Sequence, residues 1–315
     1  MRIVVRPDFD GIVCTVLLKE ALGIDEPVQW VEPNAMQSGQ VKIRKGDIIA
    51  NLAYREQCTL WFDHHVSNRP NMPFEGAFEL APSAAGLIFS FFNNFDYAKN
   101  PGGVGDSVKK FQRDFTELVA ATDKIDSASV TLDEVLHPEK YPYILLSTTI
   151  VSHRNTDEPY WDHLVDLLRN YDIRRVLEDP EVKKRCREAL EADKIYISIL
   201  KKHTVLNKHI SITDFRSFDT MPVGNRFLVF TLFPEGIVNL KIRYHDEERE
   251  TVIVSVSNNI FNRRCSVNTG LLCARFGGGG HFGAGSCSFD AGKTDEYLPE
   301  IIDILLKNEK HSLLN

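Results

Sequence analysis

Two aspartates near the start of the chain could bind a divalent cation. The hexapeptide RPDFDG at 6–11 places Asp8 and Asp10 two residues apart, between an expected strand and an expected helix. Parallel sheets build their sites at the carboxyl ends of strands, and carboxylate oxygens suit Mg²⁺ or Mn²⁺. Alternatively, the two carboxylates cap turns and the N-terminus of the following helix. The hexapeptide alone leaves both interpretations open.

A second group of polar residues directly follows an apolar run. The segment WFDHH at 61–65 puts Asp63, His64 and His65 at the carboxyl end of an expected buried strand. Burying one acid and two imidazoles is costly unless a partner satisfies them. A metal bound by one imidazole, with the other hydrogen-bonded to a phosphoryl oxygen, would do so. A hydrogen-bonded histidine pair at a strand end is the alternative.

The third motif is the glycine-rich segment GGGGHFGAGS at 277–286. Six of the chain's 19 glycines fall within 277–285, around a single histidine, His281. Backbone N–H groups in such segments form concave sites for anions. The lysine of a nucleoside-triphosphate P-loop is missing, so the segment does not have that function. A flexible linker is the alternative, although the residues on both sides have the composition of ordered structure.

Composition restricts the partners of the chain. Its 315 residues are 43% hydrophobic and 26% charged, which excludes a disordered, collagen-like or coiled-coil protein. Lys and Arg number 37 against 44 Asp and Glu, a net charge of −7. We therefore expect no binding of long duplex DNA, where phosphate neutralisation dominates affinity. A small anionic substrate is still compatible with a locally positive or metal-bearing cleft.

Cysteine spacing and hydropathy indicate a cytoplasmic protein. None of the six cysteines forms a Cys-x-x-Cys pair, so neither a zinc ribbon nor a redox pair is signalled. No apolar run approaches the roughly 18 residues that span a bilayer, and the first residues lack the apolar region of a signal peptide. We expect no membrane partner, and the sequence leaves a homodimer open.

The expected elements form two domains of the α/β and α+β classes. Short β-branched runs alternate with helical stretches in the first half, which predicts a largely parallel sheet with helices on both faces. The expected strands there are 2–5, 28–31, 47–51 and 58–62. One expected helix ends near residue 22, and two others cover 83–95 and 106–122. A charged helix beginning at Asp179-Pro180 separates this part from a smaller α+β domain with strands at 209–213, 226–232, 237–244 and 251–256. The expected boundaries are 1–178, 179–206 for the helical linker, and 207–315.

Taken together, the three motifs resemble those of one family. An early D-x-D-G, a central DHH and a late GGGGH-x-x-A-x-G, in that order, resemble the DHH phosphoesterase superfamily. The branch with a DHH-associated C-terminal domain is the most similar; it contains NrnA-like oligoribonucleases and exopolyphosphatase-related proteins. The resemblance implies a centre of one or two Mn²⁺ or Mg²⁺ ions that activates water for attack on phosphorus.

The resemblance also implies roles for individual residues. Asp8, Asp10, His64 and Asp123 would bind metal, with Asp126 as the substitute for Asp123. His65 would contact the substrate phosphate, and Asp63 would orient His64. The far end of the substrate would bind the C-terminal domain, across a cleft between the domains. The residues implied there are Gly278, Gly279, Gly280 and His281, with Arg264 or Arg263 as a phosphate clamp or, alternatively, as surface arginines.

Two positions depart from the family pattern. Val4 stands where a histidine is common, and Asn51 is the best match to an aspartate that bridges two metals. At most three carboxylates would then face the four charges of two divalent ions, so the site nearest Val4 is expected to bind metal weakly, or only with substrate. The expected function is hydrolysis of short oligonucleotides or small nucleotide phosphate esters. An exopolyphosphatase and a non-hydrolytic nucleotide- or phosphate-binding protein are the alternatives.

Overall fold

The computed structural model describes residues 1–65, 68–94, 109–150, 157–245 and 247–310. The chain divides into two compact units, which are described separately below. Unit 1 comprises residues 1–130 and 138–186, and unit 2 comprises 131–137 and 187–315. Helix α9, Pro180–His203, spans the division and falls within the expected linker. In the described part of the chain, no helix combines the length and hydrophobicity needed to cross a bilayer.

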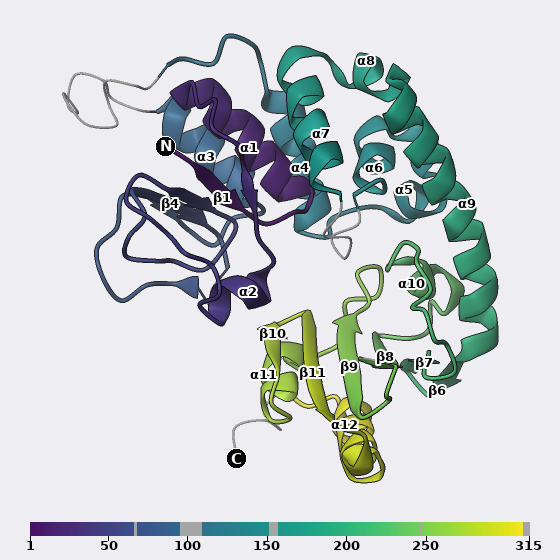
Figure 1. Ribbon diagram of the computed structural model, residues 1–315. Coiled ribbons are helices and arrows are strands. Elements are labelled where there is room, and N and C mark those ends of the chain that lie inside the picture. Colours follow the sequence, from purple (N-terminus) through teal and green to yellow (C-terminus); the bar gives the residue numbers. More distant parts are fainter. Residues whose placement is uncertain (66–67, 95–108, 151–156, 246, 311–315) are drawn as a thin grey trace. The chain divides into compact units, whose positions relative to one another are not determined.

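Unit 1 contains a five-stranded sheet in which all neighbouring strands are parallel (Figure 1). The strand order is β2-β1-β3-β4-β5. The bounds are Ile3–Val5 for β1, Gln29–Trp30 for β2, Ile48–Ala50 for β3, Leu60–Asp63 for β4 and Gly76–Phe78 for β5. This confirms the predicted parallel α/β architecture of the N-terminal part.

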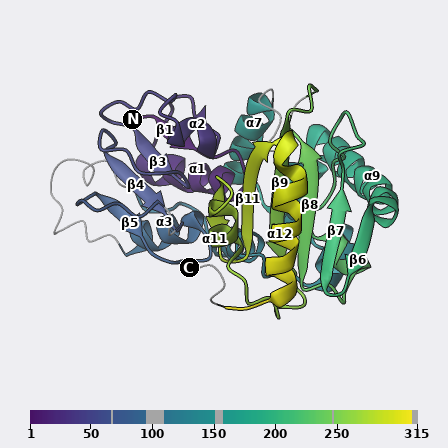
Figure 2. The ribbon, with the colours of Figure 1, turned by 90° about the horizontal axis from the view of Figure 1, so that it is seen from below.

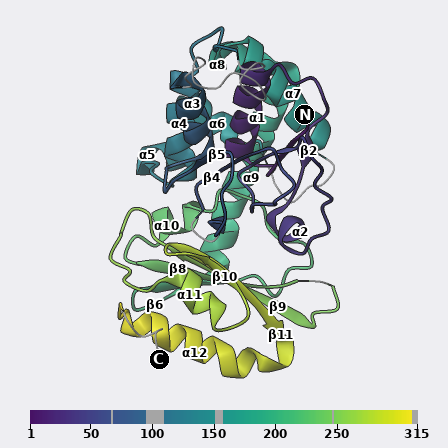
Figure 3. The same ribbon diagram turned by 90° about the vertical axis from the view of Figure 1, so that its left-hand side faces the viewer.

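Helices cover both faces of this sheet unequally. Ile3 and Val5 of β1 pack in one apolar cluster with the longer helices, whereas Val4 packs in another with Met36 of the short helix α2. This alternation follows from the two-residue period of a strand. Figure 3 shows α2 on the opposite side of the sheet from the longer helices. The bounds are Phe9–Leu22 for α1, Pro33–Gln37 for α2, Ala84–Asn93 for α3, Thr116–Asp126 for α4 and Glu158–Asn170 for α7.

The start of α4 differs from the sequence-based expectation. Residues 106–108 of the expected helix lie outside the described residues, and 109–115 are not helical. The Asp114 side chain accepts a hydrogen bond from the Thr116 N–H at 2.8 Å, a local turn that competes with helix before Thr116. Two further short helices of unit 1 are α6, Pro142–Ser147, and α8, Ile173–Glu178, whereas α5, Leu132–Leu136, belongs to unit 2.

Unit 2 contains a six-stranded mixed sheet, which confirms the predicted α+β C-terminal domain. The order is β10-β11-β9-β8-β7-β6, and only the β7–β8 pair is parallel. Figure 2 shows α12 lying against one face of this sheet and running alongside its strands. Its apolar side chains join those of β8, β9 and β11 in one core. The bounds are β6 Thr204–Asn207, β7 Ile210–Asp214, β8 Val238–Tyr244, β9 Thr251–Asn258, β10 Gly279–His281, β11 Ala284–Asp290, α11 Thr269–Ala274 and α12 Thr294–Lys307.

The expected strand at 226–232 is wrong, because this segment forms helix α10, Leu228–Leu232. Asn225 begins the helical turn: its side-chain oxygen accepts from the Phe227 N–H at 3.0 Å, and its carbonyl accepts from the Leu228 N–H at 3.1 Å. A short apolar run fits either a buried strand or a helix, so periodicity could not decide between them.

The glycine-rich segment forms a hairpin, β10 and β11, packed against α11. A Cβ on Gly270 of α11 would lie 2.4 Å from the Gly280 carbonyl oxygen, so the two backbones approach more closely than side chains would allow. Gly280 itself has φ 145°, and a Cβ there would lie 2.3 Å from the Ala284 oxygen. The glycines are therefore required by the local packing, and residues 279–281 form an ordered strand rather than a loop.

Candidate metal centre

The carboxyl ends of three parallel strands bring the polar motifs of unit 1 to one edge of the sheet. Val5, Ala50 and Phe62 lie side by side in β1, β3 and β4. The residues that follow them along each strand therefore emerge at the same edge. These are the segment from Arg6 to Asp10, then Asn51, and the Asp63 to His65 motif.

Asp10 lies buried at the junction of two helices. It belongs to the first turn of α1, and its two carboxylate oxygens accept from the Ala84 N–H at 3.0 Å and the Ala85 N–H at 2.8 Å in the first turn of α3. Helix N-termini favour a negative charge at such a position. Burial and the charge of Asp8 nevertheless outweigh these amides and raise the pKa of Asp10 to about 7.

His64 directs one ring nitrogen toward two carboxylates. Its Nδ1 donates to the Ala81 carbonyl oxygen at 2.9 Å, which leaves Nε2 with its lone pair in the neutral ring. Nε2 lies 3.2 Å from Asp126 Oδ2 and 3.9 Å from Asp10 Oδ2. This nitrogen is buried and makes no hydrogen bond to any described residue. It is therefore oriented as a ligand for a cation.

Asp126 completes this group from the end of α4. Burial, together with the charges of Asp10 and Asp8, raises the pKa of Asp126 to about 7. The ligand atoms of Asp10, His64 and Asp126 all lie within 4.8 Å of one another. Two carboxylates that repel each other around a buried nitrogen without a hydrogen bond fit a divalent cation with mixed oxygen and nitrogen ligands. Asp10, His64 and Asp126 therefore offer a donor set that suits Mn²⁺ or Mg²⁺.

Asp63 holds the neighbouring histidine. Its Oδ1 accepts from the His65 ring Nδ1 at 2.7 Å and from the backbone N–H groups of His64 at 2.8 Å and His65 at 3.1 Å. Its Oδ2 accepts from Asn68 Nδ2 at 2.6 Å. Burial lowers the pKa of His65, but the hydrogen bond and charge of Asp63 outweigh it, so the net pKa is raised. Asp63 thus orients the His65 ring directly, and His64 only through its backbone.

Asp8 has different neighbours. It caps the N-terminus of α1: its Oδ1 accepts from the Gly11 N–H at 2.8 Å and from Asn51 Nδ2 at 3.0 Å. Its Oδ2 lies 3.0 Å from the Nε of Arg6. Asn51 has left-handed backbone, φ 55°, and its Oδ1 is buried without a hydrogen bond to any described residue. The sequence-based reasoning did not single out Arg6.

Asp123 lies one turn before Asp126 and contacts α3. Its Oδ1 accepts from Ser83 Oγ at 2.6 Å, and Ser83 in turn caps α3 by accepting from the Gly86 N–H at 2.9 Å. A Cβ on Gly86 would lie 2.7 Å from Asp123 Oδ1, so a larger residue at this position would displace the Asp123 carboxylate. The structure therefore brings Asp126, rather than Asp123, together with Asp10 and His64.

The residues expected to bind the far end of the substrate belong to unit 2. Gly279, Gly280 and His281 form β10, and Gly278 directly precedes it. The two arginines are exposed: Arg263 Nε donates to the Ile260 carbonyl at 3.1 Å and Arg264 Nε to Asn262 Oδ1 at 2.8 Å. Their roles toward a substrate remain a prediction.

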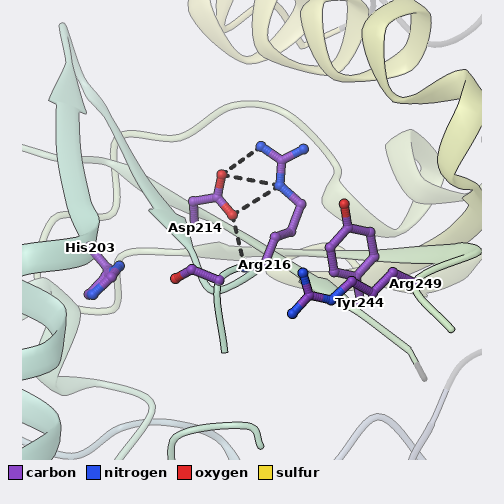
Figure 4. A pocket seen from close by; sticks show the side chains of 6 residues that line it. His203, Asp214, Arg216, Tyr244 and Arg249 are labelled. Carbon is purple, nitrogen blue, oxygen red and sulfur yellow. Dashed lines mark hydrogen bonds and ion pairs between the residues drawn. The ribbon is translucent and has the colours of Figure 1, made fainter. Parts of the chain in front are cut away.

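Unit 2 also contains an open hollow of about 420 Å³ at the ends of β7 and β8 (Figure 4). Arg216 forms an ion pair with Asp214 at 2.6 Å, and Arg249 forms one with Asp219 at 2.8 Å. These carboxylates offset the arginine charges, so the hollow is a weak candidate for an anion site. It is lined by His203, Asp214, Arg216, Ser217, Tyr244 and Arg249.

Solved structures with the same fold are found by comparison with known proteins. No family model matches the chain, and no curated protein matches it. Among solved structures, the pGpG-specific phosphodiesterase PggH from Vibrio cholerae is 29% identical, with a TM-score of 0.75 over 98% of this chain and 99% of PggH. An exopolyphosphatase-related protein from Bacteroides fragilis is 12% identical, with a TM-score of 0.52 over 100% of this chain and 94% of that one. RecJ from Thermus thermophilus, in complex with Mn²⁺, is 11% identical, with a TM-score of 0.57 over 97% of this chain and 52% of RecJ.

These likenesses confirm the resemblance to the DHH phosphoesterase superfamily that the three motifs indicate. The two structures with 11 and 12% identity share the fold alone. PggH is also similar in sequence, nearly from end to end. The name of PggH describes a phosphodiesterase that is specific for pGpG.

Proposed function

We propose that this chain is a divalent-metal-dependent phosphoesterase that hydrolyses short oligonucleotides or small nucleotide phosphate esters. The observation that carries the proposal is the convergence of Asp10, His64 and Asp126 on one point at the edge of the sheet. The 29% identity to a pGpG-specific phosphodiesterase makes the linear dinucleotide pGpG the first substrate to test.

The three converging residues would hold a single Mn²⁺ or Mg²⁺ ion. When bound, such an ion lowers the pKa of a coordinated water and stabilises negative charge on phosphoryl oxygens. The helix N-terminal amides of Ala84 and Ala85 keep Asp10 in place, and the Ala81 carbonyl fixes the ring of His64. The ligand set is thus preorganised by α3 and by the segment before it.

His65 would contact the phosphate beside the metal. Asp63 holds the Nδ1 edge of its ring, so the opposite Nε2–H edge is oriented to donate to a phosphoryl oxygen. In the reaction, the water oxygen forms a bond to phosphorus while the bond from phosphorus to the leaving nucleoside oxygen breaks. For pGpG the leaving oxygen is O3′ of the first nucleoside, which takes up a proton from the attacking water. The phosphate stays on O5′ of the second nucleoside, so both products are GMP.

The net charge of −7 favours short substrates over long polymers. In unit 2 we assign the far end of the substrate to Gly278, Gly279, Gly280 and His281, with Arg263 or Arg264 as the phosphate clamp. Exposed arginine forks can bind a phosphate with two parallel hydrogen bonds.

The test is hydrolysis of pGpG in Mn²⁺, with a longer oligonucleotide and inorganic polyphosphate as competing substrates. We expect GMP release from pGpG, and loss of at least about 1,000-fold in kcat for His64→Ala and Asp10→Asn. His163→Ala is the matched control, because His163 lies on α7 and pairs with Asp179 at 3.1 Å, away from the three ligands.

Three outcomes would contradict the proposal. Full activity of both His64→Ala and Asp10→Asn would show that these residues do not form the active site. Preferred cleavage of polyphosphate would favour the exopolyphosphatase, and nucleotide binding without turnover at any Mn²⁺ concentration would favour a non-hydrolytic binding protein.

A further inference from the structure

The guanidinium of Arg6 occupies the part of the centre where a second metal ion would need Asp8. Arg6 Nε lies 3.0 Å from Asp8 Oδ2, while Asp8 Oδ1 accepts from the Gly11 N–H and from Asn51 Nδ2. Oδ1 of Asp8 therefore accepts two hydrogen bonds, and Oδ2 forms an ion pair with Arg6, although Arg6 Nε itself makes no hydrogen bond to any described residue. We infer that Arg6 is the fixed second cation of this centre and that the chain binds one divalent ion, an inference that rests on the proposed function.

The other two positions of a second site lack suitable ligands. Val4 is fully buried in an apolar cluster with Met36 and Trp61, so its position has no donor atom. Asn51 carries no charge and its Nδ2 donates to Asp8, so its buried Oδ1, which makes no hydrogen bond to any described residue, is the one neutral oxygen that these two positions offer. The residues present therefore do not fit a second divalent ion, whereas Asp10, His64 and Asp126 fit the first.

The charge balance supports the same assignment. Asp8, Asp10 and Asp126 together contribute three negative charges when ionised. One divalent ion and the Arg6 guanidinium match them, but two divalent ions with Arg6 would leave an excess of two positive charges. A guanidinium keeps its proton under all ordinary conditions, so its charge is permanent.

Arg6 is surrounded by acids and remains accessible. The pKa of Arg6 is raised mainly by the charge of Asp8, against the effect of burial, with further contributions from Asp126, Glu32 and Asp10. About a third of its side chain, 34%, is exposed. Nε lies 3.0 Å from Asp8 Oδ2 in an ion pair, and we assign the terminal N–H groups of the guanidinium to a phosphate oxygen beside the metal.

The number of Mn²⁺ ions per chain tests this assignment without reference to activity. Calorimetric titration of the metal-free full chain with Mn²⁺ alone, and again with GMP present, should give one ion per chain. The electron paramagnetic resonance spectrum should be that of an isolated Mn²⁺. Two ions per chain, or the spectrum of an exchange-coupled pair, in either titration would overturn the inference.

Variants of Arg6 test its contact with substrate. Arg6→Met should keep the binding of the first Mn²⁺ and lower kcat on pGpG by about 100- to 1,000-fold, the usual effect of removing a positioned donor. Arg6→Lys should restore part of the rate, because it returns the charge but not the fork. Arg175→Met is the control: Arg175 is 67% exposed and pairs with Glu178 on α8.

The two proposals fail in different ways. A kcat for Arg6→Met within about twofold of the wild type would overturn the role of Arg6. Two Mn²⁺ ions with normal turnover would overturn the inference and leave the proposed function intact. One Mn²⁺ ion without turnover of any substrate would overturn the proposed function and leave the single-ion centre standing. If Arg6→Met does not fold, the Mn²⁺ count on the wild type still decides.

Discussion

Replacing Asp126 or Asp123 by asparagine should separate metal binding from helix packing. Asp126 Oδ2 lies 3.2 Å from His64 Nε2, whereas Asp123 accepts from Ser83 Oγ at 2.6 Å. We expect Asp126→Asn to abolish stabilisation by Mn²⁺ and Asp123→Asn to retain it. Both changes keep the size of the side chain and remove one charge, so each serves as the control for the other.

The size of the effect follows from ligand binding to the folded state. An ion at 100 times its Kd stabilises a protein by about 2.7 kcal/mol. For a unit of this size that corresponds to a Tm increase of about 5 to 10 °C. Loss of a ligand that weakens binding by about 100-fold or more would leave at most about 0.4 kcal/mol, a shift of about 1 °C.

Metal-free protein should show the opposite order. Asp126→Asn should be more stable than the wild type at pH 8, because it removes a partly buried charge that Asp10 and Asp8 repel. Asp123→Asn should be less stable by about 1 kcal/mol, because it weakens the hydrogen bond to Ser83. Thermal unfolding with and without Mn²⁺ measures both effects. Loss of the Mn²⁺ shift in Asp123→Asn, but not in Asp126→Asn, would refute the assignment.

Three further changes address other parts of the chain. Asp63→Asn should lower kcat by about 10- to 100-fold with one Mn²⁺ still bound, because the His65 ring loses its charged partner; unchanged kcat in a steady-state assay would exclude this orienting role. Burial and the charges of Arg243 and Arg226 lower the pKa of Lys241 to about 8, so its charge opposes folding below pH 8 and this cost disappears toward pH 10.5. Lys241→Met should therefore raise the free energy of unfolding by about 1 to 3 kcal/mol at pH 7 and by little at pH 10.5. Urea unfolding at the two pH values measures this difference, and an equal gain in stability at both would contradict the reasoning. Gly280→Ala should lower the urea midpoint, by more than about 1 kcal/mol in stability, because φ is 145° and the new Cβ would meet the Ala284 oxygen; an unchanged midpoint would argue against the hairpin.

The sequence predicts four of the five strands in the sheet of unit 1, because these are short apolar runs separated by turn residues, whereas β5, Gly76–Phe78, was not expected. Strands β1, β3 and β4 and helices α1 and α9 lie where the pattern places them. The exceptions have local causes. Helix α10 depends on a turn around Asn225, and β10 depends on backbone contact between Gly280 and α11, neither of which hydrophobic periodicity reports.

The sequence predicts those residues of the candidate centre whose positions depend only on where the parallel strands end. Asp10 and His64 meet because parallel strands end at one edge, a rule that needs no side-chain detail. Asp123 and Asp126 are one turn apart on α4, so only the packing of that helix against α3 decides which one faces His64. Arg6 gave no signal of its own, and the departures at Val4 and Asn51 predicted only weak or substrate-dependent binding at one metal site.

A crystal structure of the chain grown with Mn²⁺, with anomalous diffraction data collected above and below the manganese edge, tests the metal centre most directly. We predict one anomalous peak, bounded by Asp10, His64 and Asp126, with Arg6 still on Asp8. A peak coordinated by Asp8 and Asn51, or no peak among the first three residues, would contradict the account.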